Sequence, residues 1–205
     1  TVMRDGKKYF IDFDHGRVKD DMKQIGTVPL DQHGTIVHFY PDPDIFTETT
    51  TFDDKILKNR IRELAFLNKG LKLTFTDKRK DSAETDVYKY EGGIKEYVAF
   101  LNKGQEVLFD EPIYVESTYN GIDVEVALQY TNGYKTTLMT FANNIHTYEG
   151  GMHEAGFKTA LTRVVNDYAH KAKILKDKDD NLSGEDIREG MTAVVSVKHP
   201  SPQFE

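Results

Sequence analysis

The stretch that most constrains this chain runs from residue 141 to 169 and joins a strand end, a polar turn and a long helix. Asn143 and Asn144 predict the turn, and Gly150-Gly151 supplies permissive backbone where the helix begins. Apolar residues then recur with a 3.6-residue period, on one face made of Phe157, Leu161, Val164, Val165 and Tyr168. The pattern predicts a core helix that follows directly from a strand, with anion capture at its N-terminus as an alternative.

The composition indicates a soluble globular chain of one large domain or two small ones. Of 205 residues, 38% are hydrophobic and 30% charged, and no apolar run approaches the ~20 residues of a membrane helix. A formal net charge of −7 argues against a stand-alone polyanion binder, although lysines and arginines recur between residues 158 and 178. The absence of cysteine excludes disulfides, thiolate metal sites and a cysteine nucleophile. We expect a cytoplasmic protein with no membrane contact.

The first half of the chain predicts a hairpin, further strands and two helices. Asp5-Gly6 is a hairpin turn signal, followed by a polar connection over 16–32 and a strand over 34–40. Helices are predicted from residue 52 to Gly70 and from residue 92 to Gly104, with strands at 71–76 and 87–90 and a charged loop between them. The hexapeptide AFLNKG occurs in both helices, which predicts two similar helix ends.

The second half is β-rich before and after the long helix. Asn120-Gly121 and Asn132-Gly133 separate alternating segments, which predicts a three-stranded antiparallel meander over 112–142. A charged loop is predicted at 177–182. Ser183 is a predicted N-cap of a short helix that ends at Gly190, and residues 191–198 form a buried strand. The fold class is therefore α+β, with a change of packing unit near residues 90–105.

Residue chemistry alone gives no complete active site. Neither Gly-Gly pair has the lysine and hydroxyl of a phosphate-binding loop. His146 and His153, with two glutamates nearby, are separated by a turn and do not form the compact shell that zinc requires. Ser183 lacks a nucleophile-elbow context, so a capping role is the better interpretation. We therefore predict no catalytic residue and no metal site in this chain.

Several segments in order along the chain resemble the family of bacterial DNA gyrase B subunits, with the topoisomerase IV subunit as a near relative. The runs RDGKKYFIDFDHG, GTIVHFYPDPDIF and RIRELAFLNKGLKL carry the resemblance in the first half. YEGGIKEYVAFLN, DVEVALQY, FANNIHTYEGGMHEAGFKTALTRVVNDYA, LSGEDIREGMTAVVSVKHP and PQFE continue it to the end. The sequence of these segments is closer to gyrase of Gram-positive bacteria than to topoisomerase IV.

The resemblance implies two domains. Residues 1–73 would be the C-terminal part of a GHKL-type ATPase domain. Residues 74–205 would be a transducer domain of βαβ type, with a ribosomal-protein-like fold, truncated at its C-terminus. The family's general base, magnesium ligand and ATP lid would precede Thr1, and its Gln-Thr-Lys motif would follow residue 205. We therefore expect a fragment that is inactive on its own.

The resemblance also implies roles for a few residues. Thr35, with Gly34, matches the position beneath the adenine of bound ATP. Arg4 matches an arginine at the mouth of the nucleotide site, where aminocoumarin inhibitors bind. Lys158 and Arg163 match helix positions that can face the cavity through which DNA passes.

For the intact protein the resemblance implies an ATP-hydrolysing type II topoisomerase that uses Mg²⁺ and introduces negative supercoils. Its partners would be the gyrase A subunit in an A2B2 heterotetramer, DNA, and a second copy of the gyrase B protein on ATP-driven dimerisation. Two alternatives remain open: a topoisomerase IV subunit that decatenates DNA, and a non-catalytic interaction module.

Overall fold

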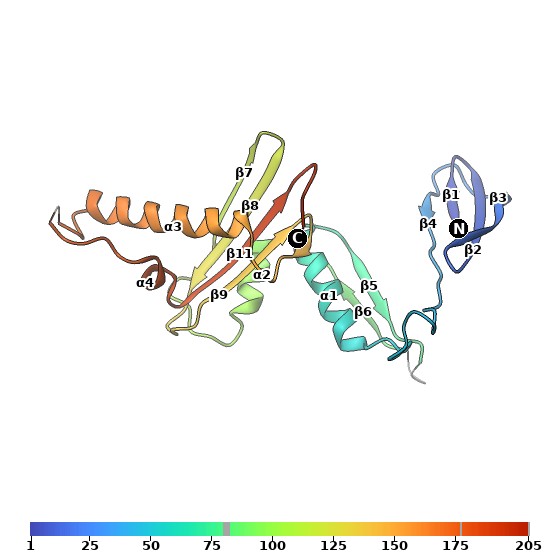
Figure 1. Cartoon of the computed structure of the whole chain (residues 1–205), viewed down its shortest axis with the longest axis horizontal. Helices are drawn as coiled ribbons and strands as arrows, with labels where there is room; N and C mark the ends of the chain where they lie inside the picture. The colour runs from blue at the N-terminus through green and yellow to red at the C-terminus, as the bar shows by residue number, and fades with distance from the viewer. Residues whose placement is uncertain (80–82, 177, 205) are drawn as a thin grey trace. The chain divides into compact units, whose positions relative to one another are not determined.

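The computed structural model describes residues 1–79, 83–176 and 178–204, so the predicted charged loops at 78–86 and 177–182 lie partly outside the described residues. The chain forms two compact units, Thr1–Asp53 and Asp54–Glu205 (Figure 1). The boundary between the units lies twenty residues before the domain boundary predicted at 73/74. That domain boundary stays a prediction.

The first unit is a four-stranded antiparallel sheet in the order β3-β2-β1-β4. The strands are β1 (Val2–Arg4), β2 (Lys7–Asp14), β3 (Arg17–Thr27) and β4 (Gly34–Thr35). The predicted hairpin is confirmed, because β1 pairs with β2 across Asp5 and Gly6, which have φ angles of 51° and 73°. Left-handed backbone at both turn residues matches the twist of the two strands.

Two predictions in this unit are wrong. The polar connection predicted over 16–32 contains β3, which pairs with β2 through a second left-handed turn at His15-Gly16. The side chains of β3 are nearly all exposed and mostly polar, so the strand lacks the apolar alternation that would have indicated it. The strand predicted over 34–40 is confined to Gly34 and Thr35, because its partner β1 pairs with it through Val2 and Met3 alone.

The second unit is organised around a five-stranded sheet in the order β10-β9-β11-β8-β7. Its strands are β7 (Ile113–Tyr119), β8 (Ile122–Tyr130), β9 (Thr137–Ala142), β10 (Ile145–His146) and β11 (Met191–Lys198). The hairpin between β7 and β8 turns at Asn120-Gly121 as predicted. The three-stranded meander is wrong, because β11 lies between β8 and β9, antiparallel to the former and parallel to the latter.

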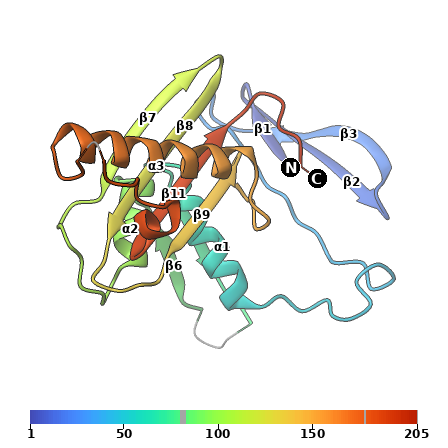
Figure 2. The ribbon, with the colours of Figure 1, turned by 60° about the vertical axis from the view of Figure 1, so that its left-hand side comes forward.

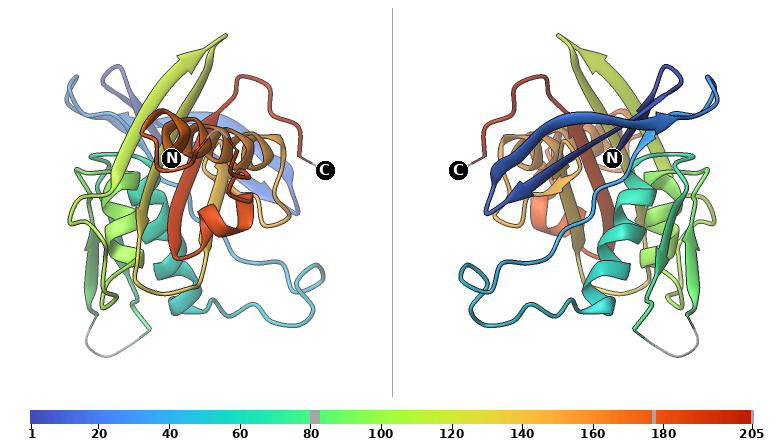
Figure 3. Two further views of the ribbon diagram at one scale, coloured as in Figure 1. Left: turned by 90° about the vertical axis from the view of Figure 1, so that its left-hand side faces the viewer. Right: turned by 90° about the vertical axis from the view of Figure 1, so that its right-hand side faces the viewer.

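The helices cover both faces of this sheet. One buried cluster joins Phe66 of α1 (Asp54–Leu67) and Val98 of α2 (Ile94–Leu101) to Val194 of β11. The other joins Ala193 of β11 to Phe157 of α3 (Met152–Lys171). Because neighbouring strand residues point to opposite faces, α1 and α2 cover one face and α3 covers the other, as Figure 2 and the opposed views of Figure 3 show. Six consecutive residues of β11, Met191–Ser196, are buried.

The remaining elements are a small hairpin and a short helix. Strands β5 (Leu73–Thr76) and β6 (Thr85–Tyr88) pair antiparallel beside α1. Helix α4 is Gly184–Arg188, and its predicted N-cap is confirmed because the Ser183 hydroxyl accepts a hydrogen bond from the Asp186 amide at 3.1 Å. Among the helices of the described residues, none combines the length and the apolar character that crossing a bilayer requires.

The apolar face predicted for the long helix is only partly correct. Phe157 and Leu161 pack against the sheet, but Val164 and Tyr168 are 58% and 66% exposed. The buried side chain in the next turn is Asn166, whose amide donates to Leu182 O at 3.0 Å and accepts from Leu182 N at 2.8 Å. An amide whose polar atoms are all hydrogen-bonded can be buried. A buried residue can therefore lie at a helix position that the periodicity of apolar residues does not indicate.

The two AFLNKG segments form the two similar helix ends that were predicted. Gly70 and Gly104 follow α1 and α2 with φ angles of 77° and 85°. Each asparagine of the repeat then bonds to the sheet layer. Asn68 accepts from Asn144 at 3.1 Å, and the buried Asn102 donates to Gln129 at 2.9 Å.

Replacing Gly190 with alanine should strongly destabilise the second unit. Gly190 has a φ of 72°, and a Cβ there would lie 2.5 Å from Gly133 O and 2.8 Å from Thr131 O. Gly104, with φ 85° and no atom within 4 Å of such a Cβ, is the matched control. We expect Gly190→Ala to lower the free energy of unfolding by about 2–4 kcal/mol and Gly104→Ala by about 1–2 kcal/mol. Equal losses in denaturant titrations would contradict this explanation.

Candidate functional site

Strands β1 and β4 bring three of the predicted site residues together in the first unit. Val2 pairs with Thr35 and Met3 with Gly34. Directly paired residues share a face of a sheet, and so do residues two apart on one strand. The side chains of Arg4 and Thr35 therefore project from the same face, two positions apart, while Gly34 adjoins Met3, whose Cε would lie 3.8 Å from a Cβ at this position.

Both Arg4 and Thr35 are exposed on this face and can be reached by a ligand. The Arg4 side chain is 78% exposed, and its Nε lies 3.9 Å from the Asp5 carboxylate, which is itself exposed. Thr35 is exposed, and its hydroxyl makes no hydrogen bond with another of the described residues. A hydroxyl and a guanidinium on one face can contact the polar groups of a molecule lying across the sheet edge.

One further group in the first unit has ligand spacing for a cation. Ligand atoms of His15, Asp42 and Asp44 lie within 4.8 Å of one another, and His15 Nε2 is 3.5 Å from Asp42 Oδ2. Neighbouring carboxylates raise the pKa of His15, with Asp14, bonded to it at 2.8 Å, as the main cause. Exposed acidic clusters form without a metal, so this group alone does not define a metal site.

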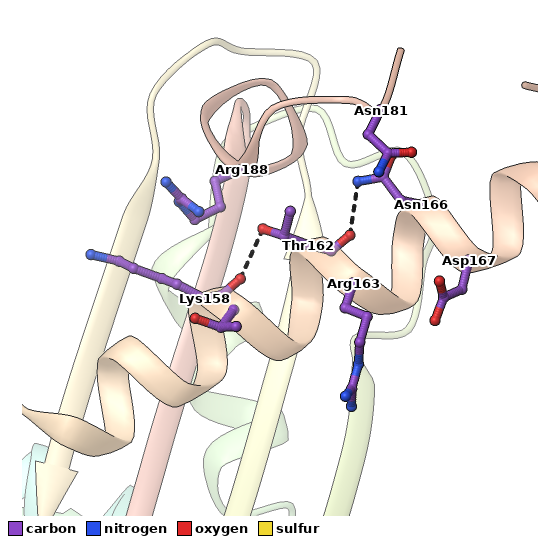
Figure 4. Close-up of a pocket in the computed structure, with 8 residues that line it drawn as sticks. Lys158, Thr162, Arg163, Asn166, Asp167, Asn181 and Arg188 are labelled. Carbon is purple, nitrogen blue, oxygen red and sulfur yellow. Dashed lines mark hydrogen bonds between the residues drawn. The ribbon is translucent and has the colours of Figure 1, made fainter. Parts of the chain in front are cut away.

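In the second unit, a groove of about 520 Å³ runs along α3 where α4 and the loop before it approach the helix. Three cationic side chains line it: Lys158, Arg163 and Arg188. Figure 4 shows Lys158 and Arg188 on one side of α3, with Arg163 extending from the other side. Five residues of helix correspond to a rotation of about 140°, so the two predicted cations cannot share one narrow face.

The three cations differ in their partners. Lys158 Nζ lies 2.5 Å from Glu154 Oε1, one helical turn away. Among the described residues, neither Arg163 nor Arg188 has a carboxylate within salt-bridge distance. Arg188 was not among the residues predicted from sequence; its position at the end of the short helix predicted from Ser183 was the available signal.

A polar cluster surrounds the first turn of α3. Buried Thr140 bonds to the Thr147 hydroxyl at 2.7 Å and donates to Glu154 Oε2 at 3.3 Å. The Thr147 hydroxyl also contacts His153 Nε2 at 3.0 Å. Because Glu154 already places a carboxylate in this first turn, the negative charge that a helix N-terminus favours is supplied by the chain itself. This weakens the alternative of anion capture at this helix.

The two histidines of this region are half-buried. The His146 ring stacks on Phe141, with ring centroids 4.9 Å apart, and lies tilted against Tyr148, with ring centroids 3.8 Å apart. Burial lowers the pKa of His146 and of His153, because removal from water disfavours the charged imidazolium. Among the described residues, neither histidine belongs to a group with metal-ligand spacing.

Comparison with known proteins gives consistent matches. The family model described as DNA gyrase B matches residues 93–205. The DNA gyrase B protein of Enterococcus faecalis is 56% identical over 204 residues, and that of Streptococcus pyogenes serotype M3 is 58% identical. Both alignments cover the whole of this chain but only 32% and 31% of those proteins. The chain thus spans about a third of the length of these curated relatives.

Solved structures also match over all or nearly all of this chain. The 43K ATPase domain of Thermus thermophilus gyrase B, in complex with an aminocoumarin, is 39% identical with a TM-score of 0.83. The match covers all of this chain and 55% of that one. The topoisomerase IV ATP-binding domain of Francisella tularensis, with a small-molecule inhibitor, has a TM-score of 0.80 at 24% identity, over 99% of this chain and 54% of that one. At that identity the likeness concerns the fold alone.

The two half-buried histidines predict that stability falls in mild acid. Their pKa values are lowered in the folded state, so below about 6.5 the unfolded chain binds more protons than the folded one. The contribution of these two histidines to the free energy of unfolding should therefore be nearly constant well above pH 6.5 and should decrease as the pH falls through about 6.5 toward 5. His146→Phe, which keeps the ring stack, combined with His153→Gln should flatten this slope in denaturant titrations.

The matched control for this measurement is His33→Gln, which removes an exposed histidine from the first unit. It should leave the slope unchanged. A double variant that keeps the full slope would show that other groups cause the acid sensitivity.

Proposed function

The chain belongs to the DNA gyrase B family, and from this premise we propose that it is the part of a gyrase B protein that couples ATP binding to DNA strand passage. The observation that carries the proposal is 56–58% identity to curated gyrase B proteins along the entire chain. The intact protein would hydrolyse ATP with Mg²⁺ and introduce negative supercoils. It would work in the cytoplasm with the gyrase A subunit, as A2B2, and with DNA.

We further propose that residues 1–73 complete the GHKL-type ATPase domain and that residues 74–205 are the transducer. In this assignment Thr35 and Gly34 line the nucleotide site and Arg4 lies at its mouth. The common face of Arg4 and Thr35 supports the assignment, since one ligand lying across β1 and β4 could reach both. The Thermus relative binds an aminocoumarin, and Arg4 is the residue proposed to contact such an inhibitor here.

We propose that helix α1 transmits movement from the ATPase part to the transducer. It ends the proposed ATPase part, yet it packs with the five-stranded sheet. The Phe66 ring stacks between Tyr90 and Tyr97, with centroids 3.6 and 4.6 Å away, and Arg60 donates to Asn144 O at 2.8 Å. A helix fixed in this way moves with the sheet as one body, so a displacement of α1 on ATP binding would carry α3 with it.

We propose that the groove on α3 contacts DNA during passage. Lys158 and Arg163 would neutralise phosphates from the two sides of the helix seen in Figure 4. Such contacts depend on charge and not on base sequence, as a segment that must be transported requires.

A supercoiling assay tests the proposed activity. The full-length protein that carries this chain, mixed with its A subunit, ATP and Mg²⁺, should introduce negative supercoils into relaxed plasmid. Decatenation without supercoiling would assign the protein to topoisomerase IV. Neither activity from folded and assembled subunits would leave the interaction module as the remaining explanation.

The DNA role of the groove is tested separately. In the full-length enzyme, Lys158→Gln with Arg163→Gln should raise the DNA concentration that half-maximally stimulates ATP hydrolysis. The slope of its logarithm against the logarithm of salt concentration should fall by up to about 2, one unit for each lost phosphate contact. The matched control removes two exposed lysines elsewhere, Lys72→Gln with Lys103→Gln. Equal behaviour of the two double variants would contradict the DNA role.

A further inference from the structure

We propose that Glu154 is a fixed counter-ion for Lys158 that weakens the hold of the α3 groove on DNA phosphate. The inference rests on the proposed function of that groove and adds a residue that regulates it. Its basis is the unequal pairing of the three cations, of which Lys158 has a carboxylate partner among the described residues.

The ion pair has favourable geometry. Glu154 precedes Lys158 by four residues on α3, the order that suits both the side-chain directions and the helix dipole. The Lys158 side chain is 39% exposed and that of Glu154 is 21% exposed. The ammonium group is therefore reachable from solvent, whereas the carboxylate is held closer to the protein.

The carboxylate is anchored independently of the lysine. Its second oxygen, Oε2, accepts from Thr140, a residue only 1% exposed, and Thr140 is itself bonded to Thr147. The carboxylate also adjoins Gly150, where a Cβ would lie 3.2 Å from Glu154 Oε2. Glu154 thus stays in place when Lys158 turns away, and a phosphate must compete with it for the ammonium group.

The surroundings of the pair reinforce this competition. A second hollow of about 370 Å³ on the same side of α3 contains Lys158 and Arg188 together with Glu154 and Glu185. Two cations and two carboxylates leave this hollow with no net formal charge. A passing DNA segment would meet a weak phosphate contact here, which favours its release.

The test is a double-mutant cycle in the full-length enzyme with its A subunit, using linear duplex DNA over a salt series. We expect Glu154→Gln to lower the half-saturating DNA concentration for ATPase stimulation about two- to fivefold, the range typical of an exposed ion pair. The salt slope should steepen by about one unit, as for one added phosphate contact. In a Lys158→Gln background, Glu154→Gln should have no effect on either quantity.

Two controls separate the pair from general electrostatics and from folding. Glu185→Gln removes from the same hollow a carboxylate that, within the described part of the chain, forms no ion pair with Lys158, and it should change the slope less. Glu154→Asp keeps the charge and should return the DNA dependence toward that of the unmodified enzyme. Equal slopes for Glu154→Gln and Glu185→Gln would overturn the inference.

The remaining outcomes distinguish this inference from the function on which it rests. If Lys158→Gln weakens the DNA response but Glu154→Gln matches the unmodified enzyme, the counter-ion is wrong and the DNA groove stands. If Lys158→Gln has no effect, alone or together with Glu154→Gln, Lys158 does not contact DNA, and both the inference and that part of the proposed function fail.

Discussion

Burial of β11 on both faces is the constraint on which the second unit depends. Six consecutive residues, Met191–Ser196, are removed from water, which requires that both faces of this internal strand are covered, as the two helical layers do here. One face of the strand packs under α1 and α2, and the other under α3. The position of α3 over the second face in turn places Lys158 beside the groove that Arg188 also lines. A buried strand thus determines the geometry of a charged surface.

The sequence predicted local elements better than their arrangement. Turn glycines and helix stops are local, so the Asp5-Gly6 hairpin, the stop of α2 before Gly104 and the Ser183 cap were found. The order of the strands is not local: two Asn-Gly signals favoured a meander because nothing nearby shows that β11 separates β8 from β9. The apolar run of β11 was recognised as buried, but burial alone does not identify its neighbours.

For the sites, residue chemistry alone indicated little and the family resemblance supplied the candidates. The structure brings Arg4 and Thr35 onto one face, and it separates Lys158 from Arg163 around α3. The polar cluster at the first turn of α3 could not be predicted, because Thr140 and Glu154 are fourteen residues apart and look like ordinary strand and helix residues. These two side chains reach hydrogen-bond distance only when β9 and α3 are packed together.

The central place of β11 also bears on how the protein is made. Among the strands of the described residues it comes last in its sheet along the chain, yet it occupies the middle of that sheet. Until residues 191–198 emerge from the ribosome, the facing edges of β8 and β9 have no partner, and open strand edges invite pairing with other chains. The contact of Asn143 with His199 also waits for that moment. Synthesis of β11 is therefore the step that covers the facing edges of β8 and β9 and, among the described strands, leaves only β7 and β10 as edge strands of the sheet.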